Sequence, residues 1–113
     1  MTIDEVKEIV KSYNFQLKDG LFTTVFVCFN DSDIWDYEQC KHPNALLYIE
    51  PDEIGIYKNL SITENNKLVI TDGKSYILNT YTTKLLINHI EKTILKFKTL
   101  RCKLQLEKIK EDF

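Results

Sequence analysis

The sequence predicts an α+β fold: a short N-terminal helix, an antiparallel meander of about five to seven short strands, and a long C-terminal helix packed across the sheet. Two observations lead to this prediction. Apolar residues recur with helical spacing over residues 2–13, alternate with polar ones over 15–80, and return to helical spacing over 82–112. The chain has 113 residues, of which 43% are hydrophobic, so we expect one domain spanning residues 1–113.

The N-terminal segment carries a signal for the start of a helix. Thr2-Ile3-Asp4-Glu5 matches a capping box, in which the Thr2 hydroxyl accepts a backbone N–H and Glu5 reaches back to the cap. A single apolar stripe follows, made of Ile3, Val6, Ile9, Val10 and Tyr13. An amphipathic helix is therefore predicted over residues 2–13.

The middle of the chain is predicted to form strands joined by tight turns. Asp19-Gly20 and Asp72-Gly73 are signals of two-residue hairpin turns, and Pro51 stands at the favoured second position of another turn. The predicted strands are residues 15–18, 21–29, 45–49, 54–58, 67–71 and 74–79. Residues 31–43 lack the alternation and are expected to form a loop.

The end of the chain is predicted to form one long helix. Residues 84–112 contain neither Gly nor Pro and are rich in Lys, Leu, Ile and Glu. At 1.5 Å per residue this helix would be about 45 Å long. A folded chain of this length has a radius of gyration of roughly 13 Å. The helix is therefore expected either to break or to extend beyond its own domain.

The predicted C-terminal helix has two apolar seams on nearly opposite sides. The first seam, expected to lie on the sheet, is Leu86, Ile90, Thr93, Phe97, Leu100 and Leu104. The second seam is Leu95, Thr99, Cys102, Leu106, Ile109 and Phe113. Leaving the second seam in water would forfeit roughly 1.5–3 kcal/mol for each large side chain. We therefore predict a homodimer or a partner-bound state through it, with Cys102 as a buried reduced thiol. The alternative is a break near Arg101 that folds the last dozen residues back.

Charge is divided unevenly along the chain. Residues 1–81 carry a net charge of −6 and residues 82–113 carry +4. The basic residues that can contact phosphates are Lys96, Lys98, Arg101 and Lys103. The competing interpretation is a solvated helix face, which the single Arg of the chain and an isoelectric point near 5.7 favour. Nucleic acid is thus the less favoured partner.

Residues 31–38 are predicted to form a distinctive surface segment, because they combine the only Trp with a Tyr, an Ile and four acidic residues. Aromatic anchors surrounded by charge are typical of interface hot spots, and the carboxylates would attract a basic partner. The predicted partner-binding residues are Asp31, Asp33, Trp35, Asp36, Tyr37 and Glu38. The alternative is that Ile34 and Trp35 fold inward over the sheet while the acidic side chains stay in water.

Residues suited to catalysis or metal binding are few and poorly spaced. Cys40 and His42 show neither an adjacent base nor a set of four zinc ligands, so we interpret them as ordinary loop residues. His89 lies beside the first seam and is interpreted as a histidine at the core boundary. The sequence has no Gly-rich phosphate loop and no nucleophile motif. We therefore expect no enzymatic activity, no cofactor and no metal.

The composition also bears on location. Three cysteines without paired spacing indicate reduced thiols. The first residues lack the basic and apolar regions of a secretory signal, and no stretch approaches the roughly 18 apolar residues of a membrane span. We expect a cytoplasmic protein with no membrane contact.

The favoured function is a non-enzymatic protein-binding module that docks on a larger protein as an inhibitor or effector. The chain is short and free of motifs, and its excess of Lys, Ile and Asn indicates AT-rich codons. In this general character it is similar to the small effectors of phages and mobile elements, including anti-CRISPR and other inhibitor proteins, and to bacterial toxin-immunity proteins. The alternatives are a nucleic-acid-binding regulator that uses the basic C-terminal helix, and a small enzyme that uses Cys40 and His42.

Overall fold

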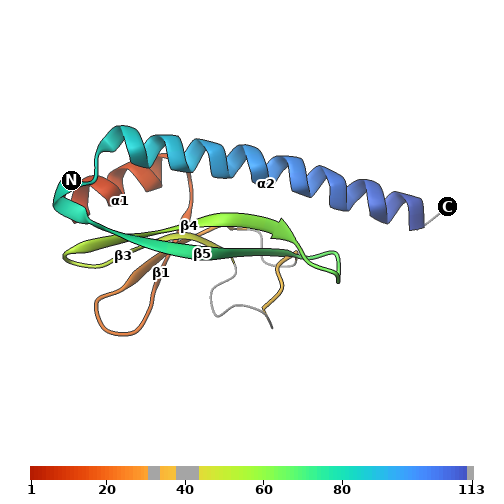
Figure 1. The fold of residues 1–113 in the computed structure, drawn as a ribbon, viewed down its shortest axis with the longest axis horizontal. Helices are drawn as coiled ribbons and strands as arrows, with labels where there is room; N and C mark the ends of the chain where they lie inside the picture. The colour runs from red at the N-terminus through yellow and green to blue at the C-terminus, as the bar shows by residue number, and fades with distance from the viewer. Residues whose placement is uncertain (31–33, 38–43, 112–113) are drawn as a thin grey trace.

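Two helices lie on one face of a five-stranded antiparallel sheet in the computed structural model, which confirms the predicted α+β fold (Figure 1). The structure describes residues 1–30, 34–37 and 44–111. Its elements in chain order are α1 (Ile3–Ser12), β1 (Gln16–Asp19), β2 (Val25–Cys28), β3 (Ala45–Ile49), β4 (Glu53–Ile62), β5 (Leu68–Ile77), the 3-10 helix η1 (Leu78–Thr80) and α2 (Thr83–Glu111).

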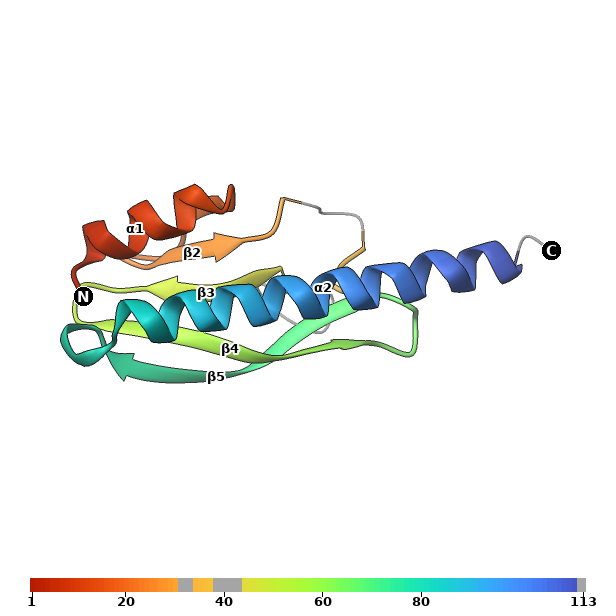
Figure 2. The same cartoon turned by 90° about the horizontal axis from the view of Figure 1, so that it is seen from above.

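The sheet is a meander, as predicted. Strands β1 to β5 are neighbours in their sequence order, and each pairs antiparallel with the next. In Figure 2, α2 runs lengthwise over the sheet, along β3 and β4, while α1 lies beside it on the same face. Because both helices cover one face, the apolar side chains of that face form the main core with them.

Helix α1 begins where the capping box predicts. The Thr2 hydroxyl accepts the Glu5 N–H at 3.3 Å, which satisfies one of the free amides of the first turn. Val6 and Val10 are fully buried on the inner side of the helix. The predicted helix is therefore confirmed, one residue shorter at each end.

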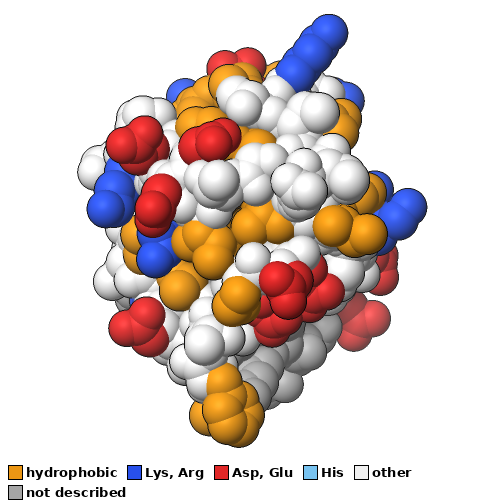
Figure 3. Space-filling view, turned by 90° about the vertical axis from the view of Figure 1, so that its left-hand side faces the viewer, with side chains coloured by type: hydrophobic (Ala, Val, Ile, Leu, Met, Phe, Trp, Pro, Cys, Tyr) orange, Lys and Arg blue, Asp and Glu red, His pale blue; other side chains and the backbone are white. Residues whose placement is uncertain are grey.

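The first hairpin has a longer turn than the sequence predicts. β2 begins at Val25 rather than at residue 21, and the Gly20 N–H donates to the Thr24 carbonyl at 2.9 Å. The left-handed residue of this loop is Phe22, with φ of 59°, and its side chain is fully exposed. The predicted two-residue turn at Asp19-Gly20 is wrong, because the loop runs over residues 20–24. Gly20 instead permits close packing, since a Cβ on it would lie 2.5 Å from the Phe26 ring. In Figure 3, which looks at this end of the molecule, hydrophobic side chains project at the bottom of the view, the side on which this loop lies in Figure 1.

The second predicted hairpin is also wrong. Strand β5 runs without a turn through Asp72-Gly73 and stays paired with β4 on both sides of them. Asp72 adopts a left-handed φ of 61°, and the Asn59 side-chain amide donates to its carboxylate at 3.1 Å. Asp tolerates this conformation, so the Asp-Gly pair kinks a long strand instead of ending it.

The turn between β4 and β5 lies earlier in the chain. The Thr63 N–H donates to the Lys67 carbonyl at 2.7 Å, and Asn66 takes a left-handed φ of 58°. Asparagine is one of the residues that favour this conformation in turns. The hairpin of two long strands, β4 and β5, therefore replaces the short hairpin of residues 67–71 and 74–79 expected from the sequence. The expected hairpin around Pro51 is retained as β3 and β4.

All three glycines lie beneath aromatic rings. The pairs are Gly20 with Phe26, Gly55 with Tyr48, and Gly73 with Tyr57. A Cβ on Gly55 would lie only 1.8 Å from a carbon of the Tyr48 ring, so no other residue fits under that ring. Gly55 and Tyr57 point away from the helices, because side chains alternate along β4 and Lys58 faces α2.

Helix α2 extends past the sheet. Its 29 residues span about 43 Å, and the molecule is 52 Å long but only 27 by 21 Å across. Figure 1 shows the last turns of α2 projecting beyond the β4–β5 hairpin. Among the described residues, no helix combines the length and apolar character needed to cross a membrane.

Candidate functional site

The first seam of α2 fixes the helix on the sheet. The Thr82 hydroxyl accepts the Leu85 N–H at 3.2 Å and caps the first turn. All members of the seam are buried or half-buried, as predicted: Leu86, Ile90, Thr93, Phe97, Leu100 and Leu104. This half of the helix thus supplies a wall of the core.

The second seam lies in solvent. Leu95 and Leu106 expose 68% and 58% of their surface, and Thr99 and Cys102 are exposed as well. We call these four residues the outer seam. The other two predicted members, Ile109 and Phe113, lie outside the side chains that the structure describes. The outer seam, with two large exposed apolar side chains on one helix face, is therefore a candidate interaction surface.

The alternative of a break near Arg101 is wrong. Helix α2 continues without interruption to Glu111, because residues 84–111 contain no Gly or Pro and favour the helical state. The chain therefore does not fold back to cover the outer seam. Cys102 is exposed here, so the burial predicted for it requires a second molecule.

Basic side chains lie on both sides of the outer seam. At about 100° per residue, Lys98 lies on one side of the seam, and Lys96 and Lys103 lie on the other. These residues and Arg101 are all exposed. The outer seam is therefore an apolar stripe with a cationic border.

Trp35 belongs to the core rather than to the surface. Only 1% of it is exposed, and its ring stacks on Phe29 at 5.4 Å and on Phe97 at 6.0 Å between ring centres. The three rings gather because together they remove a large apolar area from water. The inward-facing alternative therefore holds for Trp35, which is not available as an exposed anchor.

The neighbours of Trp35 divide between core and surface. Asp36 is 4% exposed, although the sequence placed it in water, and its N–H donates to the Leu68 carbonyl at 2.8 Å. Tyr37 is exposed. The other predicted residues of this segment, Asp31, Asp33 and Glu38, lie outside the described residues, and their role in partner binding stays a prediction.

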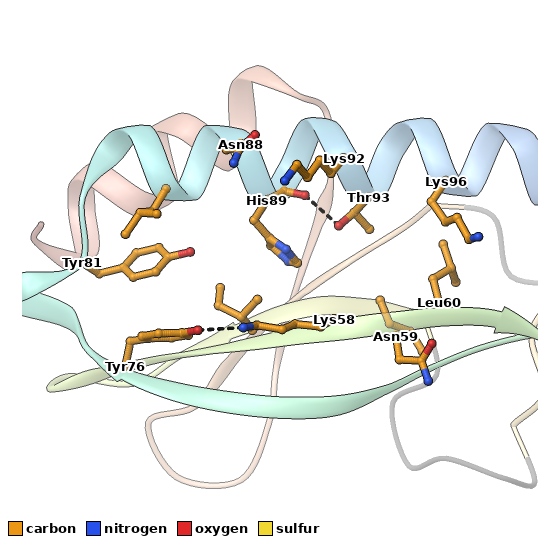
Figure 4. A pocket seen from close by; sticks show the side chains of 13 residues that line it. Lys58, Asn59, Leu60, Tyr76, Tyr81, Asn88, His89, Lys92, Thr93 and Lys96 are labelled. Carbon is orange, nitrogen blue, oxygen red and sulfur yellow. Dashed lines mark hydrogen bonds between the residues drawn. The ribbon is translucent and has the colours of Figure 1, made fainter.

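A cleft of about 630 Å³ opens between α2 and strands β4 and β5 (Figure 4). The polar and aromatic residues that matter for its chemistry are Lys58, Tyr76, Tyr81, Asn88, Lys92 and Lys96. The sequence did not reveal this cleft, because its two walls come from segments that are far apart in the sequence. The sequence feature that could have indicated one wall of the cleft is the pair Lys92 and Lys96, which are four residues apart and therefore lie on one face of the helix.

His89 lines the same cleft at the boundary of the core. Its Nε2 lies 3.0 Å from the Leu46 carbonyl, so this nitrogen carries a proton and donates. Burial lowers the pKa of His89, and the charge of Lys58 acts in the same direction, while the hydrogen bond to Leu46 opposes both. The ring is thus held neutral near pH 7, as a structural residue at the core boundary.

The candidate catalytic pair, Cys40 and His42, lies outside the described residues. Within the described part of the chain, no group of three or more His, Cys, Asp or Glu residues is arranged to hold a metal ion. Comparisons with protein families, with curated proteins and with solved structures found no match for this chain.

Proposed function

We propose that this chain is a protein-binding module that docks on a larger protein through the outer seam of α2. The observation that supports this function is the exposure of Leu95 and Leu106 on a helix that extends past its own sheet. Burying each leucine on a partner would contribute about 1.5–3 kcal/mol. A projecting helix with an exposed apolar stripe is suited to insertion into a groove of another protein.

The border of the outer seam defines the chemistry of the partner. Lys96, Lys98 and Lys103 favour a groove with an apolar floor and carboxylates along its rim. Two copies of α2 placed seam to seam would bring these lysines together, and like charges at an interface are unfavourable. A larger acidic protein is therefore the favoured occupant, and the homodimer is the alternative.

Inhibition is the role that we propose for this docking. A small module that fills a groove excludes whatever else binds there. The support for an effector of phage or mobile-element type, anti-CRISPR-like in its action, is the short, motif-free and AT-biased sequence. The activity of a captured partner, measured with and without the chain, tests this role.

Capture from host lysate tests the docking surface. Leu95→Glu and Leu106→Glu should each abolish capture of the partner, because a carboxylate cannot enter an apolar groove without losing its hydration. Leu21→Glu is the matched control, since Leu21 is as exposed as Leu95, at 69%, but lies in the β1–β2 loop. A partner retained equally by all three variants would refute the role of the outer seam.

Light scattering distinguishes a second copy from a larger partner. With an acidic partner as the occupant, the mass should stay that of one chain from micromolar to millimolar concentration. A doubling of mass that Leu106→Glu abolishes and Leu21→Glu preserves would instead assign the outer seam to a homodimer.

Nucleic-acid binding is the second candidate function. The observation that favours it is the exposure of Lys96, Lys98, Arg101 and Lys103 on one helix. Binding through phosphates should strengthen at low salt and disappear when Lys96, Lys98 and Arg101 are changed to Glu. The absence of any DNA or RNA binding at low salt would exclude this function.

A further inference from the structure

The cleft beneath α2 concentrates positive charge in an acidic molecule. The chain has a net charge of −2, yet Lys58, Lys92 and Lys96 all line this cleft and none of the lining residues is acidic. Within the described part of the chain, none of the three lysines forms an ion pair. Gathered cations raise the local potential and attract an anion.

The lysines approach from both walls of the cleft. In Figure 4, Lys92 and Lys96 extend from α2, while Lys58 lies along the floor formed by β4. Lys58 Nζ donates to the Tyr76 hydroxyl at 2.9 Å, and this hydrogen bond lowers the pKa of the Tyr76 phenol. Lys74 adds a further cation 5.3 Å from the centre of the Tyr76 ring.

The end of the cleft away from Lys96 is aromatic, and the Lys58 amine reaches into this end to meet the Tyr76 hydroxyl. The rings of Tyr76 and Tyr81 lie 5.2 Å apart there, and Leu85 exposes 51% of its surface beside them. Figure 4 shows Tyr76 and Tyr81 at the end of the cleft away from Lys96. The Asn88 side chain offers a donor and an acceptor between the two ends. A ligand that matches this lining carries both an anionic group and a ring.

Size and charge narrow the class of ligand. The volume of about 630 Å³ lies within the range of pockets that hold small molecules, roughly 300–1,000 Å³. Three lysines match a phosphate group better than a single carboxylate, because a phosphate carries up to two negative charges and several acceptor oxygens. Lysine binds phosphate as a point charge and needs no planar fork.

We propose that the cleft between α2 and the β4–β5 hairpin binds a small phosphorylated molecule with a ring, of nucleoside monophosphate size. Lys58, Lys92 and Lys96 supply the positive charge that attracts the phosphate, and the ring packs against Tyr81 and Leu85. None of the residues of this site belongs to the outer seam, and only Lys96 also lies on its cationic border, so this site and the docking function can fail separately.

Amide chemical shifts of the full chain, recorded at low salt, test the site. The probes are the four ribonucleoside 5′-monophosphates, glucose 6-phosphate, inorganic phosphate and adenosine. At least one ring-bearing phosphate should shift the amides of residues 58–60 and 85–96, and bind about tenfold more tightly than inorganic phosphate or adenosine. If none of the ring-bearing phosphates shifts these amides at millimolar concentration, the proposal is wrong.

Charge variants establish where the phosphate lies. Lys58→Gln and Lys92→Gln should each weaken binding about tenfold or more, because each removes a charged hydrogen-bond donor. Lys98→Gln is the matched control, since Lys98 is an exposed lysine of the same helix that does not line the cleft. Equal weakening by all three variants would show a general attraction to positive charge and overturn the site.

Binding of a single-stranded oligonucleotide tests whether the cleft recognises a small molecule or whether its lysines recognise a nucleic-acid polymer. Shifts confined to the cleft, with an affinity no higher than that of the monophosphate, support the proposal. Shifts that spread over residues 98–108, with no binding of any monophosphate, would assign the lysines to a nucleic-acid surface instead and refute the small-molecule site.

Discussion

The near half of α2, residues 83–100, and its far half, residues 101–111, are one continuous helix in two different environments. The near half buries Leu86 and Ile90 completely, whereas every described side chain from residue 105 to 108 is exposed. The far half remains helical because extending an existing helix adds one hydrogen bond per residue without a new nucleation cost. Apolar spacing therefore identifies the two seams, and burial depends both on which face the sheet covers and on how far the sheet reaches.

The largest difference between the two halves should be in the free energy of unfolding when one leucine of each half is changed to alanine. Leu86→Ala should lower the free energy of unfolding by about 2–5 kcal/mol, because it leaves a cavity in the core. Leu106→Ala should change it by less than about 0.5 kcal/mol in the isolated chain. Urea unfolding at micromolar concentration measures both. Similar costs for the two variants would mean that the far half is packed in solution.

Cysteine reactivity should sharpen the same comparison. Burial raises the pKa of the Cys28 thiol, and Cys28 lies in the core, whereas Cys102 is exposed on the far half of α2. In a Cys40→Ser background, a thiol reagent should label Cys102 roughly a hundredfold faster than Cys28 at pH 8. Protection of Cys102 that increases with protein concentration would instead indicate that the outer seam is covered by a second copy.

The smallest effect should be a pH dependence that originates in the near half. Because the pKa of His89 is lowered by folding, the unfolded chain binds a proton at this histidine at a higher pH than the folded chain does. Stability from this group is therefore complete above about pH 6.5 and is lost as pH falls toward the folded pKa. His89→Gln keeps a donor for Leu46 but does not titrate, so its unfolding free energy should fall less steeply over pH 6.5–5. Identical slopes in the two proteins would contradict the assignment.

Local signals predicted the elements that depend on neighbouring residues. The capping threonine and the apolar stripe located α1 to within one residue at each end, and the absence of Gly and Pro predicted the unbroken α2. The meander order was predicted from the alternating strands, since consecutive antiparallel strands usually pair. These features are set within a few residues of chain, which is why the sequence alone was sufficient.

Features that depend on distant residues were not predictable in the same way. Asp72-Gly73 is a turn signal by itself, but its pairing with β4 keeps the strand continuous. Trp35 was interpreted from the sequence as a surface anchor, but in the fold it packs against Phe29 and Phe97, which come from other elements. The cleft likewise joins α2 to two strands, so no single segment of sequence contains it.

The close approach of Gly55 to the Tyr48 ring makes these two positions epistatic. With Tyr48 present, Gly55→Ala must displace the ring, since the added carbon would lie 1.8 Å from it. When Tyr48 is changed to Ala, Gly55→Ala only fills space that the ring no longer occupies. A double-mutant cycle should therefore give a large coupling energy, on the order of 0.5–3 kcal/mol. Sequence change on the open face of the sheet is accordingly easiest in pairs, a ring and the glycine beneath it together.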